Sequence, residues 1–336
     1  MNPTHRHLRN LAWFAVAFAL LVIVFGAFVR LSNAGLSCPD WPTCYGKLTW
    51  PKHDHEIEAA NAAFPERAVE SHKAWREQVH RFLAGGLILT TFGLTVLAWR
   101  RRRELPGIAP VLVATSALIV FQALLGMWTV TWKLKPVVVM AHLVGGLSTF
   151  CLLSYVALCL TLPARGGADT AALRRMTVIG IALVALQIAL GGWTSANYAA
   201  LACGTDFPTC AGRWWPAMDF REAFVLWRGI GVNYEGGVLD ADARTAIQLT
   251  HRIGALVVFG HLLGVIAAAW RRRSGGLAVA LALALAVQIA LGISNVMLGL
   301  PLPVATAHNA GAALLLLLLL VLFVRLRRTG DDGRAP

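Results

Sequence analysis

The chain of 336 residues is 57% hydrophobic and only 14% charged, and its mean hydropathy is +0.63. Soluble globular proteins carry about 25% charged residues, so this composition excludes an ordinary soluble domain. The formal net charge of +13 could suggest a nucleic-acid partner. The arginines, however, stand in separate short clusters beside apolar stretches, which argues against a continuous basic surface, and we expect no nucleic-acid partner.

Eight apolar stretches each have about the 20 residues that cross a hydrocarbon core of about 30 Å. In chain order they are Leu11–Leu31, Val79–Trp99, Pro110–Trp132, Val137–Leu162, Met176–Asn197, Ile247–Trp270, Leu277–Leu298 and Val304–Leu326. The first resembles a signal peptide in its basic start, but it is longer than the usual apolar region and no small-residue cleavage site follows it. We therefore predict an all-α integral membrane protein with eight transmembrane helices.

Clusters of arginine follow alternate stretches. They are Arg100–Arg103, Arg165 with Arg174 and Arg175, Arg271–Arg273, and Arg325 with Arg327 and Arg328. With eight spans, all of these clusters share one side with both termini, and an excess of positive charge marks the cytoplasmic side. We expect a multi-pass protein of the bacterial inner (plasma) membrane, with cytoplasmic termini and with the loops Ser32–Glu77 and Tyr198–Ala246 outside.

Four of the six cysteines lie in these two loops, as the pairs Cys38 with Cys44 and Cys203 with Cys210. Because the exterior is oxidising, each pair predicts a disulfide within its own loop. A zinc site is the weaker alternative, since a structural site needs about four ligands and neither pair has further ligands at a suitable spacing.

An internal repeat relates the two halves of the chain. The loop segment LSCPDWPTCYGKLTWP resembles LACGTDFPTCAGRWWP, and the span residues agree at offsets of 165, 166 or 171. The matching pairs are Cys38 with Cys203, Cys44 with Cys210, Gln122 with Gln288, Gly126 with Gly292, His142 with His308, and His80-Arg81 with His251-Arg252. We predict two tandem four-helix bundles, residues 1–165 and 166–336, related by pseudo-twofold symmetry along the membrane normal.

Four histidines recur near the predicted outer ends of the spans: His80 and His142 in the first half, and His251 and His308 in the second. An ionisable side chain inside a span is costly and marks a functional site. Two histidines on different helices of one bundle can supply both axial nitrogens of a heme iron, and the glycines that follow them would let a flat ring approach. The alternative is that these histidines only cross-link helices by hydrogen bonds. His261 has no counterpart, and we expect it to be a hydrogen-bonded structural residue.

One neighbour of the repeated histidines differs between the halves. Glu77 stands three residues before His80, and Gln248 stands three residues before His251, so each shares a helix face with its histidine. A carboxylate can exchange a proton or stabilise a nearby cation, whereas an amide cannot. The first half is therefore the predicted reacting site and the second a permanent electron-transfer site. The alternative is that Glu77 caps the start of the second span.

The residues after the first histidine of each pair, Arg81 and Arg252, are candidates for pairing with heme propionates. Snorkelling of their long side chains to the membrane interface is the competing interpretation.

The motifs GLSCPDWPTC, EQVHRFLAGG, AHLVGG, AHNAGA and THRIGAL together resemble the heme A synthase family over nearly the whole chain. This resemblance implies oxidation of the C8 methyl of heme O to a formyl group by successive hydroxylations. It implies that Glu77, His80 and His142 form the substrate heme site, and that His251 and His308 hold a heme b cofactor. Heme O synthase and an electron acceptor are then expected partners, besides membrane lipid.

Three other functions remain open at this stage. A diheme cytochrome b that carries electrons in the membrane would explain four histidines but not the difference between Glu77 and Gln248. A heme exporter would usually show broken helices or polar residues at mid-membrane, and here the polar residues gather near the outer ends. A non-catalytic oxidase assembly factor is the third.

Overall fold

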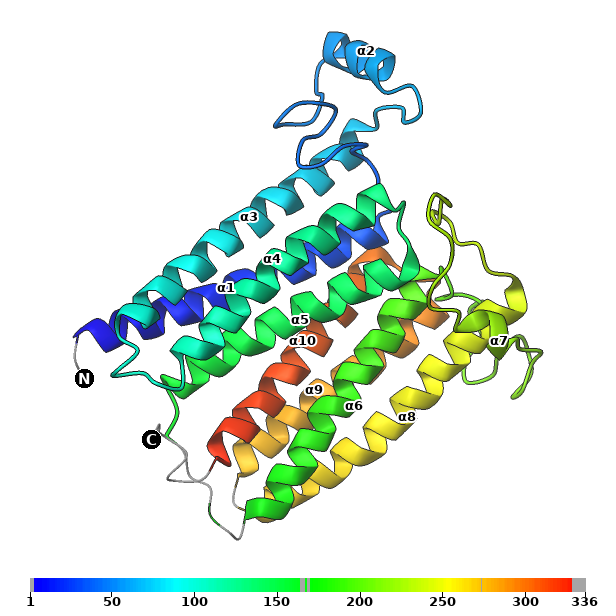
Figure 1. Cartoon of the computed structure of the whole chain (residues 1–336). Helices are drawn as coiled ribbons and strands as arrows, with labels where there is room; N and C mark the ends of the chain where they lie inside the picture. Colours follow the sequence, from blue (N-terminus) through cyan, green and yellow to red (C-terminus); the bar gives the residue numbers. More distant parts are fainter. Residues whose placement is uncertain (1–2, 164–166, 168–169, 273, 328–336) are drawn as a thin grey trace.

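The computed structural model describes residues 3–163, 167, 170–272 and 274–327 (Figure 1). Its helices are α1 (Pro3–Leu31), α2 (Asp54–Ala63), α3 (Ser71–Arg100), α4 (Ala109–Thr131), α5 (Pro136–Cys159), α6 (Ala171–Ala196), α7 (Phe220–Ala223), α8 (Ala241–Arg271), α9 (Gly275–Met297) and α10 (Leu302–Arg325). Arg165, Arg273 and Arg328 of the predicted basic clusters, and the predicted boundary between the halves, lie outside the described residues.

Eight of the described helices, all except α2 and α7, are long and apolar enough to cross a membrane. The predicted all-α class and the eight predicted spans are thus confirmed, and the chain is a multi-pass membrane protein. Three of the spans begin six or more residues earlier than predicted, α1 at Pro3, α3 at Ser71 and α8 at Ala241. Their added turns are polar and carry no hydropathy signal. The start of α8 is instead fixed by Asp240, whose carboxylate accepts the Ala243 N–H at 2.8 Å.

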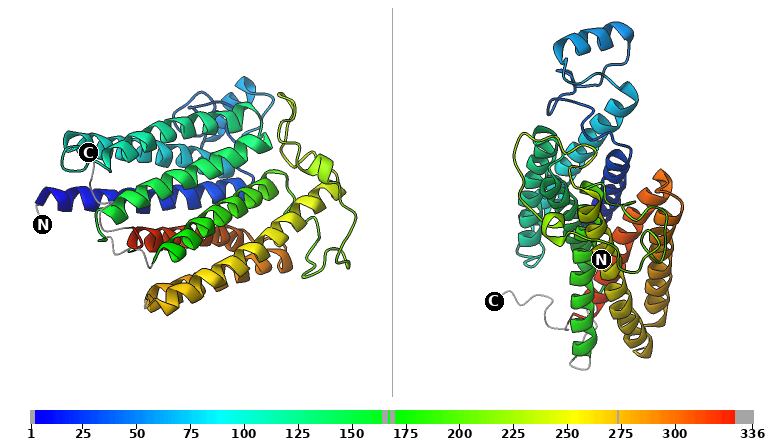
Figure 2. Two further views of the ribbon diagram at one scale, coloured as in Figure 1. Left: turned by 60° about the horizontal axis from the view of Figure 1, so that its bottom comes forward. Right: turned by 90° about the vertical axis from the view of Figure 1, so that its right-hand side faces the viewer.

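The spans form two rings of four helices. In the first half α1 packs on α3, α3 on α4, α4 on α5 and α5 on α1, and in the second half α6, α8, α9 and α10 repeat the same order of neighbours. The halves meet where α5 contacts α6 and α10 and where α1 contacts α10, and they form two adjoining groups in the left view of Figure 2. The same order of neighbours in both halves is what a duplicated four-helix unit would give. The pseudo-twofold axis along the membrane normal stays a prediction.

Close packing between the helices relies on small and aliphatic side chains. On α1 the fully buried residues Ala12, Ala15 and Ala19 follow the spacing of one helix face. Lipid tails are as apolar as leucine, so small residues that let helices approach closely contribute much of the packing energy in a membrane. One hydrophobic core runs through both halves, from Leu94 and Phe150 to Leu281 and Leu319, and gives the histidine-bearing helices a rigid frame.

Loop 1 (residues 32–70) and loop 2 (residues 197–240) lie at the end of the bundle opposite to the start of α1 and the end of α10 (Figure 1). Loop 2 also reaches the first half. The Tyr234 N–H donates to the Lys133 carbonyl at 3.1 Å, and Arg67 of loop 1 pairs with Glu235 of loop 2 at 3.0 Å. The two loops are therefore joined to each other across the end of the bundle.

Both predicted disulfides are present. Cys38 joins Cys44 with a Cα–Cα distance of 4.8 Å, and Cys203 joins Cys210 with a Cα–Cα distance of 4.6 Å. Because each sulfur is bonded to its partner, the zinc alternative is wrong for these pairs.

An aspartate organises the turn at each disulfide. Asp40 accepts the N–H groups of Tyr45 at 2.6 Å and Gly46 at 2.9 Å, and Asp206 accepts the Gly212 N–H at 2.6 Å. The backbone hydrogen bond from Gly212 lowers the pKa of the Asp206 carboxyl, because it stabilises the charged form. The repeat thus extends to the hydrogen bonds that shape the two loops.

Candidate functional site

The four repeated histidines lie in about the first three turns of α3, α5, α8 and α10, all of which begin at the loop end of the bundle. In the first half, a Cβ added at Gly26 of α1 would lie 2.8 Å from the His80 ring. A Cβ added at Gly126 of α4 would lie 3.4 Å from the His142 ring. Each ring therefore packs against the bare backbone of a neighbouring helix, which only glycine provides.

The second half repeats these contacts. A Cβ added at Gly191 of α6 would lie 3.1 Å from the His251 ring, and one at Gly292 of α9 would lie 3.2 Å from the His308 ring. The two histidines of each half stand on different helices of one ring, α3 and α5 in the first half and α8 and α10 in the second. Each half thus gathers one pair of imidazoles from two of its four helices.

Three of the glycines that follow the histidines lie against glutamine side chains. Gly145, Gly254 and Gly311 face glutamine side chains, because a Cβ at any of them would collide with an amide group. The glutamines are Gln122, Gln187 and Gln288 respectively. Gly85, which follows His80 by five residues, has nothing within 4 Å of an added Cβ. These three glycines therefore make room for an amide beside the histidine.

Several polar atoms around the histidines are buried without a hydrogen-bond partner. They include Nδ1 of His80, His142 and His308, both amide atoms of Gln122, and Oε1 of Gln187 and Gln288. Each buried polar group that stays unsatisfied costs about 1–3 kcal/mol. Such a concentration of them indicates a polar ligand. A heme whose iron takes one nitrogen from each imidazole of a pair fits this donor set.

Glu77 and Gln248 make the same contact to the two disulfide loops. The Cys38 N–H donates to Glu77 Oε2 at 2.9 Å, and the Cys203 N–H donates to Gln248 Oε1 at 2.7 Å. Both side chains are buried, with exposed fractions of 5% and 3%. The alternative in which Glu77 caps its helix is wrong, because α3 begins at Ser71 and the effect of a helix terminus is confined to the first turn.

The second polar atom of Glu77 and that of Gln248 have different partners. Glu77 Oε1 pairs with the Arg81 guanidinium at 2.6 Å, whereas the Gln248 amide donates to the Ala200 carbonyl at 2.7 Å. A buried ion pair in the first half therefore corresponds to a neutral amide in the second.

Arg81 and Arg252 bind the loops above them. Arg81 donates to the carbonyls of Asp40 at 2.9 Å and Thr43 at 2.5 Å. Arg252 donates in the same way to the carbonyls of Asp206 at 3.0 Å and Thr209 at 2.8 Å. The two guanidiniums thus hold each disulfide turn against its histidine-bearing helix. Their pairing with propionates stays a prediction.

Two features of the site escaped the sequence analysis. Gly26 and Gly191 follow the same offset as Cys38 and Cys203, so the repeat could have revealed them. Gln187, which contacts His251, has no glutamine at its counterpart position and gives no repeat signal. The expectation for His261 is confirmed, since its Nε2 lies 2.9 Å from the Met176 carbonyl.

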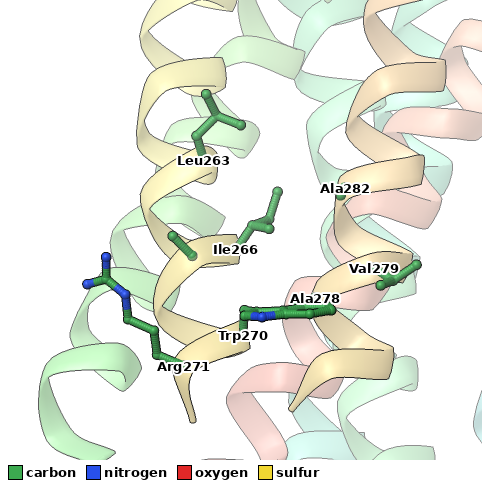
Figure 3. Close-up of a pocket in the computed structure, with 8 residues that line it drawn as sticks. Leu263, Ile266, Trp270, Arg271, Ala278, Val279 and Ala282 are labelled. Atoms are coloured by element: carbon green, nitrogen blue, oxygen red, sulfur yellow. The ribbon is translucent and has the colours of Figure 1, made fainter. Parts of the chain in front are cut away.

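A surface cavity of about 430 Å³ lies between α8 and α9 (Figure 3). Its walls are mostly apolar, among them Leu263, Ile266 and Trp270. Leu263 stands twelve residues after His251 on α8, which places the cavity about 18 Å along the helix, toward its other end. This cavity is a gap between two membrane spans and is separate from the histidine pairs.

The fold and the site together define a multi-pass membrane protein with a histidine pair in each of two helix rings, an arrangement suited to binding heme. Residues 9–320 match the model of the cytochrome oxidase assembly protein family. A heme A synthase of Shewanella oneidensis is 45% identical over 253 residues, which cover 74% of each chain. Heme A synthases of Rhizorhabdus wittichii and Mesorhizobium japonicum are 29% and 28% identical, over 82% and 80% of this chain and 81% and 77% of theirs. The chain belongs to this family, the heme A synthases, and is a membrane oxidoreductase.

Proposed function

We propose that the protein is a heme A synthase that oxidises the C8 methyl group of heme O to a formyl group. Two successive hydroxylations of one carbon give a geminal diol, which loses water to leave the aldehyde. With oxygen taken from water, methyl to formyl releases four electrons and four protons, so the reaction needs an electron acceptor. The observation that carries the proposal is the repeated histidine pair that has Glu77 beside it in one half and Gln248 in the other.

The two histidine pairs have different roles in this proposal. His80 and His142 hold the substrate, heme O, and His251 and His308 hold a resident heme b. When bound there, heme b supplies a one-electron redox centre within the membrane. The orphaned buried atoms and the glycines beside all four rings support both assignments.

Glu77 is the proposed catalytic residue of the first site. Its contacts with the Cys38 N–H and with Arg81 hold the carboxylate beneath loop 1, on the same helix as His80. In this position it either moves the proton of the methyl group or stabilises positive charge that develops there. The amide of Gln248 provides neither, and this supports the second half as the resident site.

The arrangement in the membrane is part of the same proposal. Residues 1–165 and 166–336 are the two modules, related by a pseudo-twofold axis along the membrane normal. Both termini face the cytoplasm of an inner membrane, and the histidine pairs lie toward the periplasmic side. Heme O synthase, as the source of substrate, and a membrane electron acceptor are the proposed partners.

The test compares the hemes of cells that make heme O, with and without this protein. Extracted hemes are separated and weighed by mass spectrometry. The proposal expects the hydroxyethylfarnesyl heme to be replaced by its formyl derivative when the protein is present. If heme O stays unchanged while the purified protein shows bis-histidine heme, the protein is a diheme cytochrome and the proposal fails.

A further inference from the structure

Two of the four proposed iron ligands have a glutamine amide beside a ring nitrogen: Gln288 lies 3.4 Å from His308 Nε2, and Gln187 contacts His251 at Nδ1. Gln187 of α6 places its amide nitrogen 3.0 Å from His251 Nδ1, and this nitrogen also donates to the His251 carbonyl at 2.8 Å. Gln187 stands one helical turn before Gly191, the residue against which the His251 ring packs. It therefore touches the ring from the same helix that supports it.

The first half lacks this partner. Gly26 and Gly191 are counterparts at an offset of 165, and the same offset places Val22 where the second half has Gln187. Val22 belongs to the hydrophobic core. Within the described part of the chain, Nδ1 of His80 is buried and has no hydrogen-bond partner. The two helices thus offer an amide to one histidine and a hydrocarbon to the other.

A second difference accompanies the first. Gly254 lies beside Gln187, and a Cβ at Gly254 would collide with the Gln187 Oε1 atom. The offset that relates His80 to His251 relates Leu83 to Gly254, and Leu83 packs against the core that contains Val22. Glutamine with glycine in one half therefore corresponds to valine with leucine in the other.

The chemistry of a histidine ligand gives this difference a consequence. An imidazole bound to a metal usually donates its other N–H to an acceptor, which fixes the ring and strengthens the ligand, and loss of that acceptor weakens metal binding about 10–100-fold. A glutamine amide has one acceptor oxygen, and a half-turn of the amide would bring it to Nδ1 in exchange for the hydrogen bond that the amide nitrogen makes to the His251 carbonyl. In the structure this oxygen is buried without a partner.

A resident cofactor has to stay bound, whereas a substrate heme has to leave after each turnover. We infer that Gln187, with the space left by Gly254, is a positioning residue that makes the second site retain its heme, and that Val22 and Leu83 leave His80 an exchangeable ligand. This inference rests on the proposed function, which assigns heme to both histidine pairs.

The first test uses the purified protein with its bound heme. Gln187→Val should speed transfer of the second-half heme to excess apomyoglobin about 10–100-fold and raise its midpoint potential, because the ligand becomes a weaker donor. Gln187→Glu keeps an acceptor, so it should preserve slow transfer and lower the potential. A carboxylate lowers the potential by its charge alone, so the potential of Gln187→Val is the deciding readout, and it should stay unchanged if Gln187 only fills space.

The second test transfers the feature to the first half. The double variant Val22→Gln with Leu83→Gly should slow the release of heme from His80 and His142 about 10–100-fold. Leu83→Gly alone is the matched control, because it opens the space without supplying the amide, and it should not slow release.

The outcomes separate the inference from the function. If Gln187→Val retains its heme at the unchanged rate and potential, the inference is wrong while the bis-histidine heme still supports the proposed function. If the unaltered protein contains no bis-histidine heme that depends on His251 and His308, the proposed function fails and the inference fails with it.

Discussion

The two halves share their hydrogen-bonding frame and differ in the chemical group that completes it. The Cys38 N–H donates to the Glu77 carboxylate at 2.9 Å, and the Cys203 N–H donates to the Gln248 amide oxygen at 2.7 Å. Carboxylate and amide have almost the same shape, so the exchange keeps the loop in place and changes only charge and proton capacity. A duplicated scaffold can therefore acquire two functions without any change of fold.

The largest expected effect concerns the resident heme. His251→Ala removes one of the two proposed axial ligands, so the bis-histidine absorption spectrum of the second half should be lost. His261→Ala is the matched control on the same helix, since His261 lies beside the Met176 carbonyl and Gly180 of α6 and belongs to neither histidine pair. Visible and electron paramagnetic resonance spectra of the purified variants measure the result. An unchanged spectrum in His251→Ala would place the second heme elsewhere.

Glu77→Gln sharpens the comparison, because it gives the first half the group that the second half already has. Heme A formation should fall about 100-fold if one proton-transfer or charge-stabilising group is lost. The resident heme should keep its spectrum, since His251 and His308 are untouched. Chromatography of extracted hemes gives the yield, with Gln248→Glu as the mirror control. Normal heme A production by Glu77→Gln would leave Glu77 with a structural role only.

Gly26→Ala tests the packing of the His80 ring. The added Cβ would lie 2.8 Å from the ring, so the ring or the helix has to shift, at a cost of about 1–3 kcal/mol. Thermal unfolding should show a destabilised protein, and heme content should fall in the first half. Gly93→Ala in α3, which has nothing within 4 Å of the new Cβ, should not destabilise the protein. Equal stability of Gly26→Ala and Gly93→Ala would refute the close contact.

The smallest expected effect is the pH dependence of loop 1. The backbone N–H groups of Lys52 and His53 hold the pKa of the half-buried Glu56 carboxyl at about 2. Because this pKa is depressed, the contribution to stability is present above the unfolded value of about 4.3 and is lost as the pH falls toward 2. Hydrogen exchange at these two amides, corrected for its intrinsic pH dependence, should rise over that window. Glu56→Gln should remove the pH dependence.

The sequence predicts the parts of this molecule whose signal is periodic or repeated. Lipid requires long apolar helices, so hydropathy locates the eight spans. The repeat singles out His80, His142, His251 and His308, and the oxidising exterior predicts both disulfides. The first turns of α3 and α8 were missed because polar residues at the end of a span do not differ from loop residues in hydropathy.

The missed contacts of the site are tertiary. In the sequence Arg81 and Arg252 are candidates for heme propionates or for the membrane interface, and only the folded loops show the carbonyls that they bind. Gln187 is a single glutamine in an apolar helix, and its contact with the His251 ring, which packs against Gly191, is visible only in the folded protein. Contacts of this kind join residues that are distant in sequence, and no local pattern records them.

The join between the loops sets an order of events during biosynthesis. The four helices of the first half are complete once α5 has been made, and each contacts its ring neighbours without help from the second half. The bond from Tyr234 to Lys133 and the pair of Arg67 with Glu235 form only after the ribosome has passed residue 235. At about 5–20 residues per second, the first ring exists for several seconds before loop 2 closes over its end. Translation thus leaves a short interval in which that end of the first half is less covered than in the finished protein.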